Sequence, residues 1–451
     1  MLDRIFDTFH GLALKPYVEI GFMPQALTVH PEDYTPEKVL HGKPRGAVSS
    51  GAFYPPKDYT KWEALMDAWI KHCLERYGRE EVSRWFWDLW NEPNIRYWKG
   101  TLEEYLILYD HTVAALRRVL PSARVGGPHV TNPTGKGSEE FLRAFIKHCL
   151  SGTNHVTGKT GTPVDFIGFH AKGGTQVVNG RVRMNAANHL RTIDRGCAIV
   201  ASYPELKGIP VIVGESDPDG CAACSSEFYP QNAYRNGAQF SSYTAATFMR
   251  KQDVAARHGV NLEGALTWAF AFENQPWFAG FRTLSTRGVV KPVFNTFRIF
   301  SLLEKQRVRL VNSAGRSLED LMKPESRAII DVDGVATRGD RTLSVILWHH
   351  HDDDTTGPAR NIELNVQGLP SKTRDVKLIH YRIDEHHSNA YTVWQEMGSP
   401  QNPTWQQVNA LKKAAELTLL EPCRTVKIKG GSLSLKISLP RHAVSLIRLE
   451  W

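Results

Sequence analysis

The sequence places an acidic residue, Glu92, two residues after the end of an aromatic segment, Trp85–Trp90. Aromatic side chains favour β-strands, and Pro93 ends this strand because proline cannot donate to a β-ladder. Barrels of parallel strands carry their catalytic groups at the C-terminal ends of the strands. We expect the tryptophan side chains to form a partly apolar pocket that raises the pKa of Glu92, as a general acid requires. A glutamate in a surface loop is the alternative, but Asn91 and Pro93 beside Glu92 favour the catalytic interpretation.

A second acidic residue, Glu215, follows the apolar segment Pro210–Gly214. A short, wholly apolar, β-branched segment is typical of a strand that is buried on both faces. Counting the strand-like segments places Glu215 three β/α units after Glu92, so the two carboxyl groups should face each other across the mouth of a barrel. Carboxyl groups about 5–5.5 Å apart hydrolyse glycosides with retention of configuration, one as nucleophile and one as acid/base. A structural ion pair is the alternative for Glu215 taken alone.

The elements that must position these glutamates follow an alternating pattern. From Leu2 to about Glu273, strand-like segments alternate with amphipathic helical segments, as in a parallel α/β sheet or barrel. A TIM (β/α)8 barrel needs eight strands, and the candidates fall two short. We therefore expect a TIM-type barrel whose first strands are missing, in a truncated form of a longer parent or an authentic short form. The strand candidates are Leu14–Phe22, Trp85–Trp90, Ala123–Gly127, Phe166–His170, Pro210–Gly214 and Ala265–Ala271, and the helix candidates are Leu2–Phe9, Tyr59–Tyr77, Leu102–Val119, Glu139–His148 and Asn236–His258.

The sequence changes character after about residue 300. Apolar and polar residues then alternate over strand-length segments such as Leu343–Trp348 and Leu433–Ile437, separated by clusters of turn-forming residues. This pattern is typical of an antiparallel β-sandwich, here interrupted by one helix-like segment, Trp405–Leu417. We predict two domains, an incomplete barrel catalytic domain over residues 1–300 and a β-sandwich accessory domain over residues 301–451.

Taken together, the two glutamate segments resemble those of glycoside hydrolase family 39, which includes β-xylosidases and α-L-iduronidases. Four further segments carry the resemblance, which extends over essentially the whole chain: Lys15–Pro24, Phe166–His170, Trp268–Glu273 and Gly280–Leu284. The resemblance implies a retaining enzyme that releases terminal β-D-xylosyl residues from xylo-oligosaccharides by double displacement. An α-L-iduronidase or another exo-glycosidase is one alternative, and a catalytically inactive truncated form that binds carbohydrate is the other.

The resemblance also implies roles for single residues. Glu92 matches the acid/base, and Glu215 matches the nucleophile. Asn91 matches the residue that hydrogen-bonds the sugar 2-hydroxyl, and His170 matches a histidine near the nucleophile, although a histidine satisfied within the core is the alternative there. The implied substrate-binding residues are Asn91, His170, Trp268 and Glu273.

Composition narrows the range of partners. The net charge of +8 comes from basic residues spread along the chain, without the dense cluster that phosphate binding favours, so we expect no nucleic-acid partner. No apolar segment approaches the length of a membrane span, so we expect no membrane partner either. The 12 tryptophan residues suit sugar binding or a large aromatic core. Homo-oligomer formation is left open, and the sequence indicates no cellular location.

Two further motifs look like metal or redox sites. Cys221 and Cys224 form a CxxC motif, but no second pair of ligands has metal-binding spacing, so we expect a local disulfide or two free thiols that shape the loop. The cluster His349–Asp354 follows a strand, and we interpret it as a solvated hairpin tip. The resemblance to family 39 implies no metal and no organic cofactor.

Overall fold

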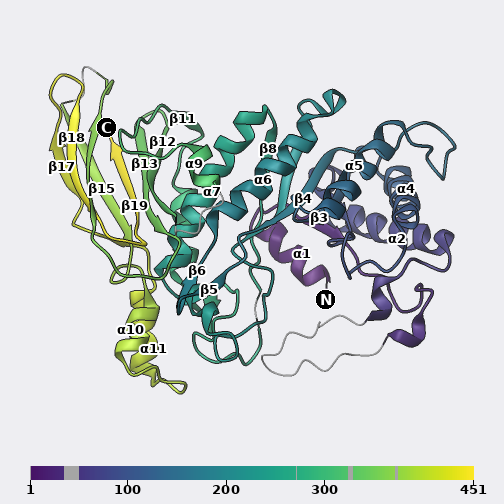
Figure 1. Cartoon of the computed structure of the whole chain (residues 1–451), viewed down its shortest axis with the longest axis horizontal. Helices are drawn as coiled ribbons and strands as arrows, with labels where there is room; N and C mark the ends of the chain where they lie inside the picture. Colours follow the sequence, from purple (N-terminus) through teal and green to yellow (C-terminus); the bar gives the residue numbers. More distant parts are fainter. Residues whose placement is uncertain (1, 35–49, 271, 324–328, 371–373) are drawn as a thin grey trace.

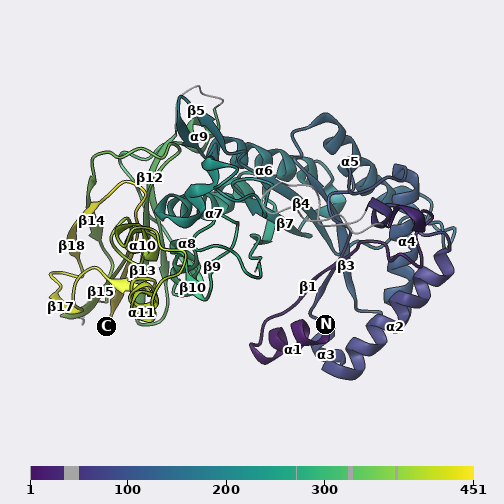
Figure 2. The same ribbon diagram turned by 90° about the horizontal axis from the view of Figure 1, so that it is seen from below.

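The computed structural model describes residues 2–34, 50–270, 272–323, 329–370 and 374–451. Its N-terminal part is built on a sheet of parallel strands in the order β1-β2-β3-β4-β7-β8. The sheet curls into a half-barrel, and among the described residues β1 and β8 form its two edges (Figure 2). The strands of this sheet are β1 (Tyr17–Ile20), β2 (Phe86–Leu89), β3 (Arg124–Thr131), β4 (Phe166–Lys172), β7 (Pro210–Asp217) and β8 (Asn261–Ala265), and β5 (Gln176–Val178) pairs separately with β6 (Arg181–Arg183).

Helices connect the strands and cover the outer face of the sheet (Figure 1). Asp58 caps α2 by accepting hydrogen bonds from the backbone of Thr60 and Lys61, and Thr101 forms a capping box with Glu104 at the start of α4. Both helices begin and end at the predicted residues. None of the helices within the described residues is long and apolar enough to cross a membrane. The helices of this part are α1 (Leu2–Gly11), α2 (Tyr59–Tyr77), α3 (Arg79–Val82), α4 (Leu102–Val119), α5 (Lys136–Ser151), α6 (Ala186–Ala201), α7 (Ala238–His258), α8 (Pro292–Ser301) and α9 (Leu318–Met322).

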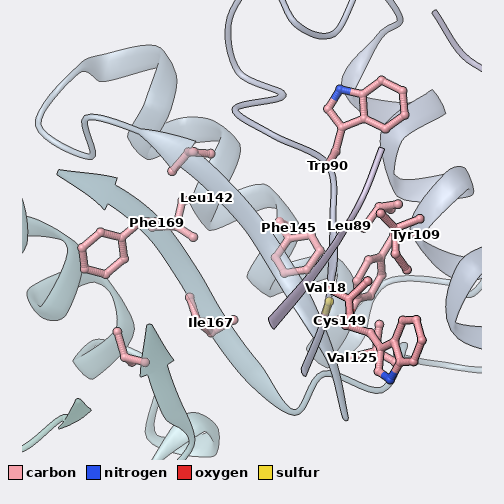
Figure 3. Close-up of a cluster of buried hydrophobic side chains, with 14 of the residues drawn as sticks. Val18, Leu89, Trp90, Tyr109, Val125, Leu142, Phe145, Cys149, Ile167 and Phe169 are labelled. Atoms are coloured by element: carbon pink, nitrogen blue, oxygen red, sulfur yellow. The ribbon is translucent and has the colours of Figure 1, made fainter. Parts of the chain in front are cut away.

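The main core lies between the sheet and these helices. Leu89 and Val125 of neighbouring strands pack with Tyr109 of α4 and Phe145 of α5, and all four side chains are fully buried (Figure 3). Because successive side chains of a strand point to opposite faces, the outward positions hold these apolar residues. The inward positions are therefore free to carry polar groups, and it is there that the candidate site lies.

The C-terminal part consists of two antiparallel sheets that share one core. The larger sheet runs in the order β11-β12-β13-β19-β15-β16, with β17 beside β15, and β14 pairs with β18. Alternate residues of β18 are buried against the larger sheet, as expected for a sandwich strand. Helices α7 and α8 pack against β12, β13 and β19, so the two parts of the chain share an interface (Figure 1). The elements are β11 (Gln306–Val308), β12 (Ile330–Arg338), β13 (Thr342–His351), β14 (Arg360–Val366), β15 (Asp375–Ile383), α10 (Ala390–Glu396), α11 (Trp405–Ala414), β16 (Thr418–Leu419), β17 (Arg424–Lys427), β18 (Leu433–Leu439) and β19 (Val444–Glu450).

The predicted fold class, a TIM-type barrel sheet followed by an antiparallel β-domain, is confirmed. The predicted boundary between residues 300 and 301 falls at the end of α8 and stays a prediction. One strand lies earlier than expected, since β8 is Asn261–Ala265 and residues 266–270 of the predicted Ala265–Ala271 strand lie beyond its end. The cause is Asp217, which binds the hydroxyl of Thr267 and the backbone N–H of Trp268 at 2.5 and 3.2 Å. Residue 271 lies outside the described residues.

The interpretation of His349–Asp354 as a solvated hairpin tip is wrong. The segment is buried up to Asp353, because it packs where α6 and α7 meet the β-domain. Asp352 accepts a hydrogen bond from the backbone of Ala186 at 3.0 Å, and Asp353 forms an ion pair with Arg183 at 2.7 Å. The CxxC motif forms a disulfide between Cys221 and Cys224, which is one of the two expected alternatives.

Candidate active site

Glu92 lies in a tight turn just after β2. Trp90 and Glu92 have positive φ values of 72° and 46°, in a region that residues other than glycine rarely adopt and that is often found at functional positions. The turn directs the Glu92 carboxyl group toward β4, where its Oε1 lies 3.0 Å from Nδ1 of His170. The residue is only 9 % exposed, so this carboxyl group is largely shielded from water.

Glu215 lies in β7, directly opposite His170 of β4 in the parallel register. Its Oε1 lies 3.8 Å from Nδ1 of His170. One oxygen of Glu92, one oxygen of Glu215 and the imidazole nitrogen all lie within 4.8 Å of one another. The structure therefore brings together the two glutamates that the sequence singles out, with the histidine between them.

The charges of this cluster influence one another. Burial raises the pKa of Glu92, but the hydrogen bond from His170 and the positive charges of His170 and Lys172 prevail and hold that pKa below its usual value. Burial lowers the pKa of His170, whereas the charge of Glu215 and the hydrogen bond to Glu92 raise it and prevail. The charged forms of Glu92 and His170 therefore stabilise each other, and one hydrogen bond joins the carboxyl oxygen to the imidazole nitrogen.

The expected rise in the pKa of Glu92 is wrong, because the tryptophan side chains point away from its carboxyl group. Trp85 and Trp87 lie on the outer face of the strand, where they pack against aromatic residues of α1 and α2. Trp90 packs edge-on against Trp98 with ring centroids 5.0 Å apart. The alternation of side chains along the strand thus sends Trp85 and Trp87 to the outer face, and Glu92 is in contact with His170.

Lys172 is a cation in direct contact with Glu215. Its Nζ forms an ion pair with Oε2 of Glu215 and lies 2.9 Å from Oδ2 of Asp217. Asp217 is fully buried, and Arg282 lies 3.2 Å from the same oxygen. Burial raises the pKa of Asp217, but the charges of Arg282 and Lys172 prevail and hold it well below its usual value. Glu92, His170 and Glu215 have the donor atoms to surround a small cation, and the Lys172 ammonium supplies positive charge at that place.

Sequence reasoning missed Lys172, Asp217 and Arg282. The first two lie two residues after His170 and Glu215, and two residues is the repeat of a strand, so each pair shares one face. The register pairs Lys172 with Asp217 just as it pairs His170 with Glu215. The spacings H-x-K and E-x-D at two strand ends were the available signal, whereas Arg282 lies in a loop that no pattern connects to the strands.

A second polar group fills the half-barrel beneath the carboxylates. The hydroxyl of Tyr17 hydrogen-bonds Nε2 of His129, and Oδ2 of Asp88 lies 3.5 Å from the same nitrogen. Burial raises the pKa of Asp88 well above its usual value and lowers that of His129 well below its usual value, because burial disfavours the charged form of each group. The His129 ring lies 5.1 Å from the His170 ring, centroid to centroid, and so supports it from below.

The other predicted site residues differ in their burial and in their contacts with the glutamate cluster. Asn91 is buried, and its Oδ1 has no hydrogen-bond partner within the described part of the chain. Trp268 is half-buried, and the cationic groups of Lys172 and Arg282 lie 5.7 and 4.8 Å from its ring centroids. Glu273 is exposed in a turn, and no hydrogen bond or ion pair among the described residues joins it to the cluster. The substrate-binding roles stay predictions.

Paired acidic groups at the strand ends of a barrel sheet are the means by which many glycoside hydrolases cleave glycosidic bonds, and the fold and the site together define that class of enzyme. The chain matches the profile of Glycosyl hydrolases family 39 over residues 1–432 and belongs to this family. It is therefore a glycosidase, and the resemblance inferred from the strand-end motifs is confirmed.

Known relatives support this assignment. The chain is 27% identical to a β-xylosidase of Geobacillus stearothermophilus, in an alignment covering 100% of this chain and 80% of the relative. It is 23% identical to an α-L-iduronidase of Mus musculus, covering 91% of this chain and 64% of that protein. Among solved structures, a monomeric β-xylosidase from Caulobacter crescentus CB15 superposes with a TM-score of 0.74 at 21% identity, covering 100% of this chain and 84% of that one.

Proposed function

We propose that the chain is a retaining exo-glycosidase that releases terminal β-D-xylosyl residues from xylo-oligosaccharides by double displacement. The proposal is supported above all by the approach of the two carboxyl groups, whose nearest cluster oxygens lie within 4.8 Å of each other. This spacing suits a retaining enzyme, with carboxyl groups about 5–5.5 Å apart, and is too short for the about 6.5–9.5 Å that an inverting enzyme needs for its water.

In this proposal Glu215 is the nucleophile and Glu92 the acid/base. The Lys172 ammonium forms an ion pair with the Glu215 carboxylate, and this carboxylate attacks the anomeric carbon. The proton shared by His170 and Glu92 passes from Oε1 of Glu92 to the leaving glycosidic oxygen. In the second step Glu92 and His170 take a proton from water, which releases the sugar and restores the starting state.

The shared proton explains how Glu92 can act as a general acid although its pKa is lowered in the free enzyme. A lone glutamate with a lowered pKa would be ionised near neutral pH and could not protonate the leaving group. His170 holds the missing proton next to the carboxylate, at 3.0 Å, and a sugar oxygen that approaches Glu92 draws it across. We therefore expect His170→Phe to lose more activity on substrates with poor leaving groups than on nitrophenyl glycosides, which need little protonation.

A second candidate is hydrolysis of a uronide, as in an α-L-iduronidase, and Lys172 is the observation that favours it. Its ammonium group lies at the mouth of the site with 15% of the side chain exposed, where it could bind the carboxylate of a uronic acid. A mouse α-L-iduronidase is among the relatives of the chain. The remaining alternative, an inactive carbohydrate-binding form, leaves the close approach of two intact carboxyl groups without a purpose.

The proposal is tested by assaying the purified chain on p-nitrophenyl β-D-xyloside and on an aryl α-L-iduronide. Activity on the xyloside that falls by about 10²–10⁴-fold in Glu215→Ala and in Glu92→Gln, with the β-anomer of xylose formed first in NMR spectra, supports the proposal. Preference for the iduronide supports the second candidate. Binding of xylo-oligosaccharides by a folded chain that cleaves neither substrate would show the inactive form and overturn the proposal.

A further inference from the structure

Helices α4 and α5 lie on the outer layer of the molecule (Figure 1). A second cluster of ligand-type side chains lies where these helices meet the loop after α5. Asp110 of α4 is fully buried, and His148 of α5 is 7% exposed. Oδ1 of Asp110 lies 2.9 Å from Nε2 of His148, and Oδ2 lies 2.7 Å from Nδ1 of His155 in the loop. These three residues take no part in the proposed catalytic reaction.

We propose that Asp110, His148 and His155 bind a divalent transition-metal ion, with zinc as the best match. One donor atom from each residue lies within 4.8 Å of the other two. Two imidazole nitrogens and one carboxylate oxygen form a ligand set that zinc commonly takes, with water as the fourth ligand. Tetrahedral bonds of about 2.0–2.2 Å require donors about 3.3 Å apart. The two contacts between Asp110 and the imidazoles, at 2.9 and 2.7 Å, therefore need to open by about half an ångström, and the two imidazole nitrogens, within 4.8 Å of each other, adjust to the same spacing.

The residues around the three ligands match those that hold ligands in metal sites. Nε2 of His155 lies 2.8 Å from Oε1 of Glu103, so this nitrogen can donate its proton to a carboxylate while Nδ1 faces the ion. The hydroxyl of Thr162 donates to Oδ1 of Asp110 at 2.5 Å. A carboxylate behind a histidine fixes its ring and raises its basicity, and a hydrogen bond to a ligating carboxylate fixes its orientation.

The loop that carries His155 is held in place by its own hydrogen bonds. The side chain of Asn154 accepts from the backbone N–H groups of Val156 and Thr157 at 3.0 and 2.8 Å. The backbone of Thr162 then donates to the last turn of α5 at 2.9 Å. His155 is therefore placed against the two helices before any ion arrives, which lowers the entropic cost of binding.

A hydrogen-bonded clasp without metal is the competing explanation for the same contacts. Elsewhere the chain uses one histidine for such a purpose, as where His111 meets Glu63 at 2.6 Å and His258 meets Asp194 at 2.8 Å. At Asp110 two imidazoles converge on one carboxylate with their rings stacked 5.5 Å apart. A clasp needs only one of them, whereas a metal site needs both. This site would be structural, and it departs from the expectation that the chain binds no metal.

The experiment is titration of the chelator-treated full chain with Zn²⁺ by calorimetry and with Co²⁺ by visible absorption. We expect the chain to bind one Zn²⁺ and to give the absorption spectrum of a Co²⁺ ion with low coordination number. Both the Zn²⁺ binding and the Co²⁺ spectrum should be lost in His148→Ala and in His155→Ala. Glu103→Gln should weaken the affinity by about 10–100-fold. His111→Ala is the matched control, because it removes a histidine of α4 that pairs with Glu63 of α2, and Glu215→Ala tests the catalytic cluster. Neither should change binding.

Two results would overturn the proposal. One is a chain with normal circular dichroism and thermal unfolding that binds no stoichiometric Zn²⁺. The other is binding that survives both His148→Ala and His155→Ala, or that disappears in Glu215→Ala. Since His155 is partly exposed, its variant keeps the helical packing intact, and its circular dichroism spectrum shows whether a loss of binding comes from unfolding. Glycosidase activity is not the readout, so failure here leaves the proposed function untouched.

Discussion

Gly214, one residue before the proposed nucleophile, leaves the space that the His129 ring occupies. A β-carbon at this position would lie under 3.0 Å from Nδ1 and Cε1 of His129 and 3.1 Å from Nε2 of His170. The φ angle of Gly214 is not among the positive values, so the requirement for glycine comes from space alone. Gly214→Ala therefore forces the ring of His129 away from β7.

The His129 ring cannot retreat freely, because Gly168 of β4 confines it on the other side and its Nε2 is bonded to Tyr17. Overpacking of a core costs about 1–3 kcal/mol, and a buried hydrogen bond left unsatisfied costs about 1–3 kcal/mol more. We expect Gly214→Ala to lose about 2–6 kcal/mol of stability. Because His129 supports His170, kcat should fall by about 10–100-fold, as a 1 Å misplacement near the reacting groups does.

Gly264 of the neighbouring strand provides the matched control. It pairs with Ile212 in the same sheet, and a β-carbon there would meet nothing within 4 Å. Gly264→Ala should be neutral or slightly stabilising, because alanine has the smaller conformational entropy to lose. Thermal unfolding and glycosidase assays of the two variants measure whether Gly214→Ala alone lowers stability and activity. Equal stability and equal activity of both would refute the role of Gly214 and the confinement of His129.

Two further changes test the charges and the helix caps. Lys172→Met removes a positive charge that lowers the pKa of Glu92, so the alkaline limb of the kcat/KM profile should move to higher pH. The low pKa of Asp217 adds stability that is present above its unfolded pKa and is lost as pH falls. The destabilisation caused by Lys172→Met, measured by thermal unfolding, should therefore shrink below about pH 4. Thr101→Ala removes the capping box of α4 and should cost about 1 kcal/mol in the same assay, with kcat unchanged.

Much of the fold could be predicted because local signals agree with tertiary packing. The helix Tyr59–Tyr77 begins after the capping Asp58 and ends before Gly78, whose φ is 83°, and both residues can be recognised in the sequence. Among the six strands predicted for the barrel sheet, Ala265–Ala271 differs most from the structure, because Asp217 accepts hydrogen bonds from the Thr267 hydroxyl and the Trp268 backbone. Such a contact has no counterpart in the local sequence.

The candidate site was predictable only in part, for a related reason. Glu92 and Glu215 stand at strand ends beside proline and glycine, and these neighbours mark them. Lys172 follows His170 within a strand, and its importance depends on the strand that pairs with it. The pKa of Glu92 was predicted with the wrong sign because adjacency in sequence was taken for adjacency in space. Trp85 and Trp87 face the outer core, and the positive-φ turn at Trp90 and Glu92 directs the carboxyl group toward His170 instead.

The charge balance of the site bears on the choice between the two candidate substrates. The carboxylates of Glu92, Glu215 and Asp217 are matched by the cations of His170, Lys172 and Arg282, joined by the close contacts described above. A neutral xyloside leaves this balance unchanged, and in the proposed mechanism the negative charge of Glu215 is consumed as the covalent bond forms. A uronide would add a carboxylate to the site. To bind that carboxylate, Lys172 would have to leave Glu215, and the nucleophile would then lose its counterion. Unless another cation moves in, the geometry therefore favours a neutral sugar.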